Sequence, residues 1–202
     1  MGISPRQLAA LEDRLRGKKP GGRSAADAGA GTKSILPKVL LGIDPSLRGT
    51  GYGVLLLEQG QPASKVFGTI KCPPKWEGSR CLAKIAQTIR ELIREHAPTV
   101  CVVEGLFYAQ NMQTALIMGQ ARGAALAAVG EAGLAIYELA PRRVKQAIVG
   151  YGAASKNAVA RMIQHQLDLA ELPEPDAADA LAVALAYTQG LGRLSLAPLK
   201  RI

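Results

Sequence analysis

Two short apolar runs, each ending in an acidic residue, constrain the fold of this 202-residue chain more than any other feature. Val39-Leu-Leu-Gly-Ile43 runs into Asp44, and Val100-Cys-Val-Val103 runs into Glu104. Continuous apolar character is typical of strands buried on both faces, as at the centre of an α/β sheet. Such sheets place their functional sites just beyond the carboxyl ends of strands. If the two strands are parallel neighbours, Asp44 and Glu104 lie together there.

The rest of the body supplies further strands and helices. Strands are predicted at 51–58, 65–71 and 134–139, and helices at 79–96, 111–132, 141–149, 155–169 and 176–189. The resulting order, β-β-β-α-β-α-β-α-α-α, predicts an α/β fold with a five-stranded mixed sheet flanked by helices. This is the order of the ribonuclease H-like fold, although other α/β arrangements share much of it.

Two acidic residues open the last predicted helix. Asp176 and Asp179 are three residues apart, so they lie on one face of its first turn. N-capping and the helix dipole explain such acids locally, and an Asx-turn before Pro45 explains Asp44. If the turn abuts the two strand ends instead, four carboxylates converge, with Glu104 as the fourth.

Four converging carboxylates would repel one another and raise one another's pKa. A pair of hard divalent cations would relieve that repulsion, because Mg²⁺ prefers oxygen ligands. Two such ions about 4 Å apart activate a water and stabilise the leaving oxygen of a phosphodiester. Arginine or lysine could neutralise the acids instead. The pattern therefore predicts either a metal centre or a cluster of ion pairs.

Composition divides the chain into three parts. The net charge is +9 with a pI near 9.7, which indicates a polyanionic partner. Residues 1–38 carry eight Lys or Arg against three acids, so an arm contributes more than half of that excess. The glycine-rich stretch 17–32 predicts a linker. We therefore expect a flexible arm at 1–36 with a short helix, a folded domain at 37–190 and a tail at 191–202.

Several classes of protein are disfavoured by the sequence. Arg122 and Glu131 interrupt the longest apolar stretch, so no membrane span is expected. Cys72, Cys81 and Cys101 are odd in number and in no C-x-x-C arrangement, which argues against disulfides and zinc. The N-terminus lacks a secretory pattern. A reducing, cytoplasmic location is the expectation.

Four ordered motifs resemble those of the RuvC family of crossover junction endodeoxyribonucleases. They are Leu41-Gly-Ile-Asp-Pro-Ser-Leu-Arg-Gly-Thr-Gly-Tyr-Gly-Val54, Val103-Glu-Gly-Leu-Phe-Tyr-Ala-Gln-Asn111 with Gly119-Gln-Ala-Arg-Gly123, Arg143-Val-Lys-Gln-Ala-Ile-Val-Gly-Tyr-Gly-Ala-Ala-Ser-Lys156, and Pro175-Asp-Ala-Ala-Asp-Ala-Leu-Ala182. The resemblance covers about Val39 to Tyr187, and the motifs occur in the family's order.

The resemblance implies a homodimer that resolves four-way (Holliday) DNA junctions by paired symmetric nicks, using two Mg²⁺ ions or Mn²⁺. Asp44, Glu104, Asp176 and Asp179 would be the catalytic, metal-binding carboxylates. A branch-migration motor complex of the RuvA and RuvB type is an implied partner.

The resemblance also assigns DNA contacts. Phe107 matches an aromatic residue that stacks on a base near the junction centre, and Lys145 and Lys156 match basic residues implicated in backbone contact and cleavage. The residues themselves suggest similar roles, because an exposed aromatic beside Glu104 suits base stacking, worth about 1–3 kcal/mol. Tyr108 offers a second aromatic, unless it packs in the core. Arg143 belongs to a basic cluster suited to phosphate contacts, unless it lies on a solvated helix face.

Two departures and two competing functions remain. Ser46 stands where the family usually has glycine, and Gly105 follows Glu104 where other members often have glutamine. A junction-binding protein that does not cleave is one alternative. An actin-like nucleotide-binding module is the other, but Gly150-Tyr-Gly-Ala-Ala-Ser-Lys156 does not fit P-loop spacing.

Overall fold

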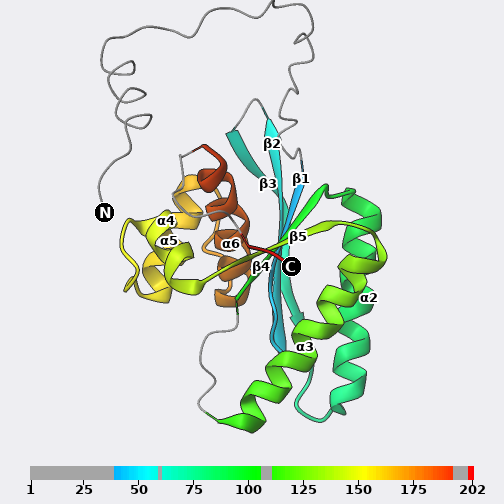
Figure 1. Ribbon diagram of the computed structural model, residues 1–202. Helices are drawn as coiled ribbons and strands as arrows, with labels where there is room; N and C mark the ends of the chain where they lie inside the picture. Colours follow the sequence, from blue (N-terminus) through cyan, green and yellow to red (C-terminus); the bar gives the residue numbers. More distant parts are fainter. Residues whose placement is uncertain (1–38, 59–60, 106–110, 193–199) are drawn as a thin grey trace, which may run out of the picture. The chain divides into compact units, whose positions relative to one another are not determined.

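The computed structural model describes residues 39–58, 61–105, 111–192 and 200–202. The chain divides into two units, residues 1–35 and 36–202, and every described residue belongs to the second. The predicted arm at 1–36 lies outside the described residues. The elements along the chain (Figure 1) are β1 Val39–Asp44, β2 Gly49–Glu58, β3 Gln61–Lys71, α2 Gly78–His96, β4 Val100–Glu104, α3 Met112–Glu131, β5 Ala135–Leu139, α4 Pro141–Val149, α5 Lys156–Gln166, α6 Pro175–Gly192 and β6 Lys200–Arg201.

The strands form one mixed sheet in the order β3-β2-β1-β4-β5-β6. β1, β2 and β3 pair antiparallel, whereas β1, β4 and β5 are parallel neighbours. The predicted count of five strands was wrong, because Lys200 and Arg201 add a sixth by pairing antiparallel with β5. Such a short strand has no apolar pattern of its own, so the sequence gives no sign of it.

Helices cover both faces of the sheet, with α2 and α3 on one side and α4, α5 and α6 on the other (Figure 1). Along β1, Leu40 packs with the α4–α6 helices while Leu41 and Ile43 pack with α2 and α3. All three side chains are fully buried. The prediction of a central strand buried on both faces is confirmed, and it accounts for the continuous apolar run.

The helix ends follow local chemistry. The Asn111 side chain accepts a hydrogen bond from the Thr114 backbone N–H at the start of α3, and Ser155 does the same for Ala158 at the start of α5. α2 ends at Ala97, whose φ of 45° is left-handed, directly before Pro98. None of the helices among the described residues is long and apolar enough to cross a membrane.

Glycines in β1 and β2 let α6 lie almost directly on the sheet. A Cβ at Gly42 would stand 2.2 Å from the Ala180 carbonyl oxygen, and one at Gly51 would stand 1.9 Å from that of Asp176. No side chain larger than hydrogen fits at either position. This close approach carries the first turn of α6 to the edge of the sheet where β1 and β4 end.

Candidate active site

The carboxyl ends of β1 and β4 bring the first two candidate acids together. The strands are parallel neighbours, with Ile43 paired to Val103, so Asp44 and Glu104 follow at the same edge. A side-chain hydrogen bond between them lowers the pKa of Asp44 and raises the pKa of Glu104. The adjacency expected from two strands that end in acids is therefore present.

The first turn of α6 brings Asp176 and Asp179 to the same edge. The Asp176 carboxylate lies directly over Gly49, where a Cβ would stand 2.5 Å from its Oδ2. The Asp179 side chain is only 15% exposed and is close enough to Asp44 and Glu104 to raise the pKa of both. Local capping is thus not the whole explanation of these acids, because they face the strand ends.

A lysine provides positive charge inside this group. Lys156, the first residue of α5, donates a hydrogen bond from Nζ to Asp179 Oδ2 at 2.9 Å. This contact raises the pKa of Lys156 above its ordinary value, so the ammonium stays charged. Its charge also lowers the pKa values of Asp44 and Glu104, although other effects outweigh it. Ion pairing with lysine, one of the two predicted ways to neutralise the acids, is therefore present in part.

One cation does not satisfy four acids. Burial, followed by the charge of Asp179, raises the pKa of Asp44 to about 6. Burial and the charges of Asp44 and Asp179 raise the pKa of Glu104 to about 8. The pKa of Asp176 is also raised, chiefly by burial. Near neutral pH the site therefore holds a proton that a stronger cation could replace.

The donor chemistry of this site fits a hard divalent cation. Its side chains offer only carboxylate oxygens, which are the ligands that Mg²⁺ and Mn²⁺ accept. In the part of the chain that the structure describes, however, no three His, Cys, Asp or Glu side chains are grouped closely enough to hold an ion. The carboxylates would have to draw together, and Asp179 would have to loosen its contact with Lys156, to share one.

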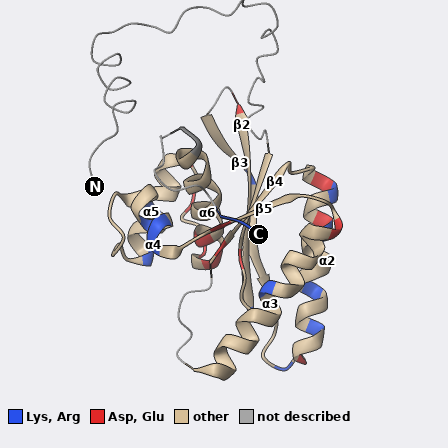
Figure 2. Cartoon of the chain, in the orientation of Figure 1, with Lys and Arg blue, Asp and Glu red and all other residues tan. Residues whose placement is uncertain are grey.

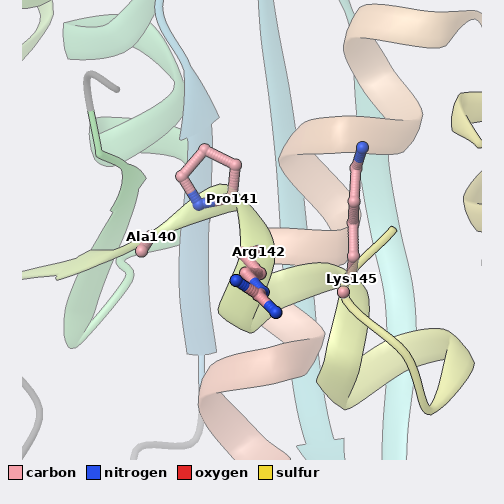
Figure 3. A pocket seen from close by; sticks show the side chains of 5 residues that line it. Ala140, Pro141, Arg142 and Lys145 are labelled. Carbon is pink, nitrogen blue, oxygen red and sulfur yellow. The ribbon is translucent and has the colours of Figure 1, made fainter. Parts of the chain in front are cut away.

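Helices α4 and α5 carry basic residues (Figure 2). Lys145 and Arg142 line a shallow pocket of about 280 Å³ together with Ala140, Pro141 and Gly152 (Figure 3). The Arg142 side chain crosses so close to Gly152 that a Cβ there would stand 2.5 Å from its Cγ. Arg143 lies half-buried on the same helix. Of the two matched lysines, Lys156 contacts the acids directly, whereas Lys145 lines the pocket on α4.

The loop that follows β1 tolerates the unusual Ser46. Among the described residues other than glycine, only Ala97 and Asp168 have positive φ, so Ser46 needs no special backbone conformation. The Ser46 backbone N–H donates to Thr50 Oγ1 at 3.2 Å, and the Thr50 hydroxyl donates to the Ser46 carbonyl at 2.5 Å. Both bonds use backbone atoms of Ser46 and the hydroxyl of Thr50, so the Ser46 side chain takes no part in closing the loop.

The remaining predicted positions lie elsewhere. Phe107 and Tyr108 fall outside the described residues. One residue that the sequence interpretation missed is Arg122, which bonds to the backbone of Glu104 from α3. The sequence shows it as an interruption of an apolar helix and as part of the motif at 119–123, with no role assigned to it. A charged residue inside an alanine- and glycine-rich helix was the available signal.

Comparison with known proteins decides the family. The model of the family "Crossover junction endodeoxyribonuclease RuvC" matches residues 40–187. The chain belongs to the RuvC family. A RuvC from Moorella thermoacetica is 45% identical over 150 residues, which cover 74% of this chain and 90% of that protein. A RuvC from Syntrophomonas wolfei is 42% identical over 149 residues, covering 73% of this chain and 87% of that protein.

Solved structures agree with this RuvC assignment. RuvC from T. thermophilus, in complex with a Holliday junction substrate, superposes with a TM-score of 0.72 at 31% identity, covering 82% of this chain and 99% of that one. A yeast mitochondrial Holliday junction resolvase has a TM-score of 0.55 at 13% identity and covers 74% of this chain and 78% of that one. The second likeness extends only to the fold, and it confirms the predicted ribonuclease H-like class.

Proposed function

We propose that this protein resolves four-way DNA junctions, cutting two symmetry-related phosphodiester bonds by metal-dependent hydrolysis. The observation that carries the proposal is the meeting of Asp44, Glu104 and the first turn of α6 at one sheet edge, where the pKa values of Asp44, Glu104 and Asp176 are raised. Membership of the RuvC family supports the junction as substrate, as does the junction bound to the T. thermophilus RuvC.

In this proposal the four acids hold two Mg²⁺ ions, for which Mn²⁺ can substitute. Such ions supply a nucleophilic water near neutral pH and stabilise the leaving oxygen. The chain's own residues do the rest. Asp44 and Glu104 give up their shared proton, Asp176 is kept in place by the close approach of α6 to β2, and Lys156 offers its ammonium to a phosphate once Asp179 is otherwise engaged.

DNA contacts are proposed on the α4–α5 side. Lys145 and Arg143 on α4 and Lys156 on α5 are proposed to supply positive charge to phosphates, and Phe107 and Tyr108 are proposed as stacking residues from the segment after Glu104. Lys145→Met should weaken junction binding for all DNA sequences and reduce the slope of log affinity against log salt by about 1. An unchanged slope would remove Lys145 from the interface.

We also propose a homodimer, as paired nicking requires two sites. The supporting observation is an apolar surface on α3, where Met112 is 76% exposed, Leu116 60% and Ile117 37%. These three side chains are close together on one helix, and a contiguous exposed apolar patch is typical of an interface. Sedimentation should give twice the monomer mass, and Leu116→Glu should return it to the monomer value. A partner motor of the RuvA and RuvB type is supported by family membership alone.

The decisive experiment uses a synthetic four-way junction with Mg²⁺. The wild type should produce two symmetric nicks whose products can be ligated. Asp179→Asn should abolish nicking while junction binding persists, because it removes a charged ligand without changing shape. Glu171→Gln, an exposed acid nearby, is the matched control and should nick normally.

Two results would contradict this assignment. Nicking by Asp179→Asn at the wild-type rate would remove Asp179 from the metal site. Junction binding by the wild type without nicking in Mg²⁺ or Mn²⁺, on junctions of varied sequence, would instead favour a binding protein that does not cleave.

A further inference from the structure

The peptide group between Glu104 and Gly105 is held at both ends. Its carbonyl oxygen accepts a hydrogen bond of 2.6 Å from Arg122 Nη1. Its N–H, which belongs to Gly105, donates to the Leu139 carbonyl at 2.8 Å. Because a peptide is planar, fixing both groups fixes the backbone torsion that follows the Glu104 Cα. The direction of the Glu104 side chain is set with it.

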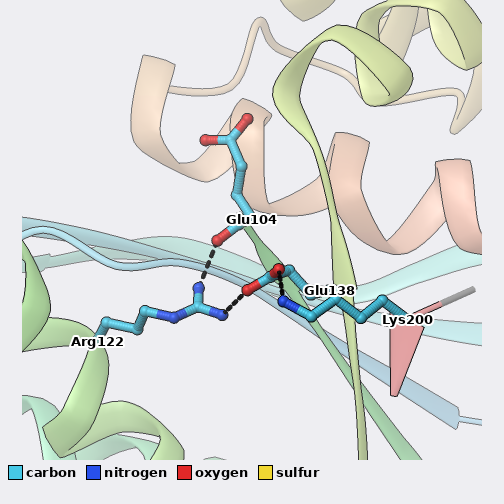
Figure 4. Close-up of polar contacts among 4 residues, drawn as sticks. All are labelled: Glu104, Arg122, Glu138 and Lys200. Carbon is cyan, nitrogen blue, oxygen red and sulfur yellow. Dashed lines mark hydrogen bonds and ion pairs between the residues drawn. The ribbon is translucent and has the colours of Figure 1, made fainter. Parts of the chain in front are cut away.

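Arg122 is itself held by a second acid. The residue is only 8% exposed, and its Nη2 donates to the Glu138 carboxylate on β5. The other carboxylate oxygen of Glu138 accepts a hydrogen bond of 2.7 Å from Lys200 Nζ on β6. A buried guanidinium needs such pairing, because an uncompensated buried charge is strongly destabilising. The chain Lys200–Glu138–Arg122–Glu104 thus ties the ends of β6, β5 and β4 to α3 (Figure 4).

Arg122 does not touch the carboxylate that it serves. Figure 4 shows the Glu104 carboxylate pointing away from the guanidinium, which reaches only the backbone oxygen of that residue. The carboxylate faces the acids of the site, whereas Arg122 approaches from α3. Any influence on the reaction must therefore pass through the backbone.

The end of β4 needs support of this kind. Glu104 and Leu139 form the last pair in the β4–β5 register, and strand ends fray when nothing holds them. Gly105 leaves the required room, since a Cβ there would stand 3.3 Å from Glu138 Cγ and 3.4 Å from the Leu139 oxygen. The glycine in this position is thus matched to the Glu138 that anchors Arg122.

We propose that Arg122 is a positioning residue for Glu104, acting on the Glu104–Gly105 peptide and anchored through Glu138 and Lys200. The proposal rests on the function proposed above, in which Glu104 is a metal ligand. Misplacement of a reacting group by about 1 Å can cost about a hundredfold in rate. The backbone contact of Arg122 keeps Glu104 within that tolerance.

The test compares Arg122→Met and Arg122→Lys with a matched control, Arg90→Met. Arg90 also pairs with a carboxylate, Glu131 on α3, but both side chains of this pair are at least half exposed. Arg122→Met should lower the single-turnover nicking rate by about ten- to a hundredfold with junction affinity unchanged. Arg122→Lys should recover part of the loss, because one ammonium can still reach the Glu104 oxygen. Arg90→Met should nick like the wild type.

A second readout needs neither DNA nor metal. Hydrogen exchange of the Gly105 amide, measured by NMR, should become about tenfold faster in Arg122→Met relative to Val102 in the middle of β4. A purely structural role would speed the two amides equally or leave both unchanged, and either result would overturn the proposal. Nicking by Arg122→Met at the wild-type rate would do the same.

If Arg122→Met does not fold, variants of the anchoring residues Lys200 and Glu138 test the proposal instead. Lys200→Met, at an exposed lysine, and Glu138→Gln should each speed Gly105 exchange, with Glu138→Gln having the larger effect. Unchanged exchange in both would overturn the proposal. If neither the wild type nor Arg90→Met nicks junctions, the proposed function has failed, and the exchange result still shows whether Arg122 positions Glu104.

Discussion

The two helical layers are attached to the same sheet by different means. On the α6 side, glycines of β1 and β2 meet the backbone of a helix rich in alanine, and the first turn of that helix delivers two acids to the site. On the α2–α3 side, larger side chains such as Ile85 and Ile89 fill the space. The α6 layer carries two of the acids to the strand ends, whereas Arg122 is the contact from α3 to Glu104 that the described residues show.

This difference predicts where the molecule tolerates change. Contact between backbone atoms leaves no freedom to repack, so even one methyl group must displace α6. Contacts between aliphatic side chains can adjust their rotamers. We therefore expect small substitutions on the α6 side to disturb both stability and the site, and similar substitutions on α3 to be harmless.

Alanine in place of glycine tests the contrast most strongly. Gly51→Ala would place a Cβ against the Asp176 carbonyl, so it should lower the free energy of unfolding by at least about 1–3 kcal/mol and impair nicking. Gly123→Ala is the matched change on α3, where a Cβ meets nothing within 4 Å. It should raise stability by about 0.5–1 kcal/mol, because alanine is the better helix former. Chemical denaturation of the two variants measures both signs.

The pH dependence of stability should also distinguish the two helical layers, and its effect should be the next largest. The pKa of Glu104 is raised to about 8, so the folded state binds a proton more tightly than the unfolded chain. The contribution of Glu104 to the stability of the metal-free protein should therefore be greatest at low pH and be lost as pH rises from about 4.5 to 8. Glu104→Gln should remove much of this pH dependence. It should also raise the free energy of unfolding at pH 8 by more than about 1.4 kcal/mol, the equivalent of one pKa unit.

Glu131, a carboxyl on α3, should contribute to stability with the opposite pH dependence. The bond from Arg90 holds the pKa of Glu131 below its usual value, so Glu131 contributes stability at neutral pH that is lost on acidification. Glu131→Gln should thus be slightly destabilising at neutral pH. A stabilising Glu131→Gln, or a Glu104→Gln that leaves the pH slope intact, would contradict this reading of the two layers.

The smallest predicted effect on stability is that of Lys156→Met. The lysine is 69% exposed, so removing its ion pair should change the free energy of unfolding by less than about 1 kcal/mol. The pKa values of Asp44 and Glu104 should nevertheless rise, because Lys156 is the cation that lowers them. Carboxyl carbon NMR titration without metal detects that rise. Lys71→Met, which removes a lysine as exposed as Lys156 from its pair with Glu174, should leave the pKa of Glu104 unchanged.

The sequence predicted most elements because their signals are local. The helix at 141–149 coincides with α4, and the other strands and helices predicted between residues 39 and 192 match observed elements with shifts at their ends. The meeting of Asp44 and Glu104 was also predictable, since parallel neighbours share an edge. Gly51 and Gly53, two residues apart in one strand, offered a signal of close backbone approach that was not used.

Other features depend on tertiary contacts that leave no local pattern. The pairing of Lys156 with Asp179 joins residues 23 apart, and a solvated lysine would look the same in sequence. The pairing of β6 with β5 depends on where the chain returns to the sheet. The bond from Arg122 to Glu104 crosses from a helix to a strand end. The sequence shows the chemical type of each of these residues, but it does not show which residue each one contacts.

The sixth strand also bears on colloidal behaviour. An open sheet edge is a template for pairing with another chain, and basic residues, proline and very short strands oppose such pairing. β6 ends one edge with two consecutive basic residues, while β3 carries Pro62, Lys65 and Lys71 along the other. Edge-to-edge growth into aggregates is therefore disfavoured at both described margins of the sheet. Among the described residues, the surfaces of the helices remain open to contact between copies of the chain.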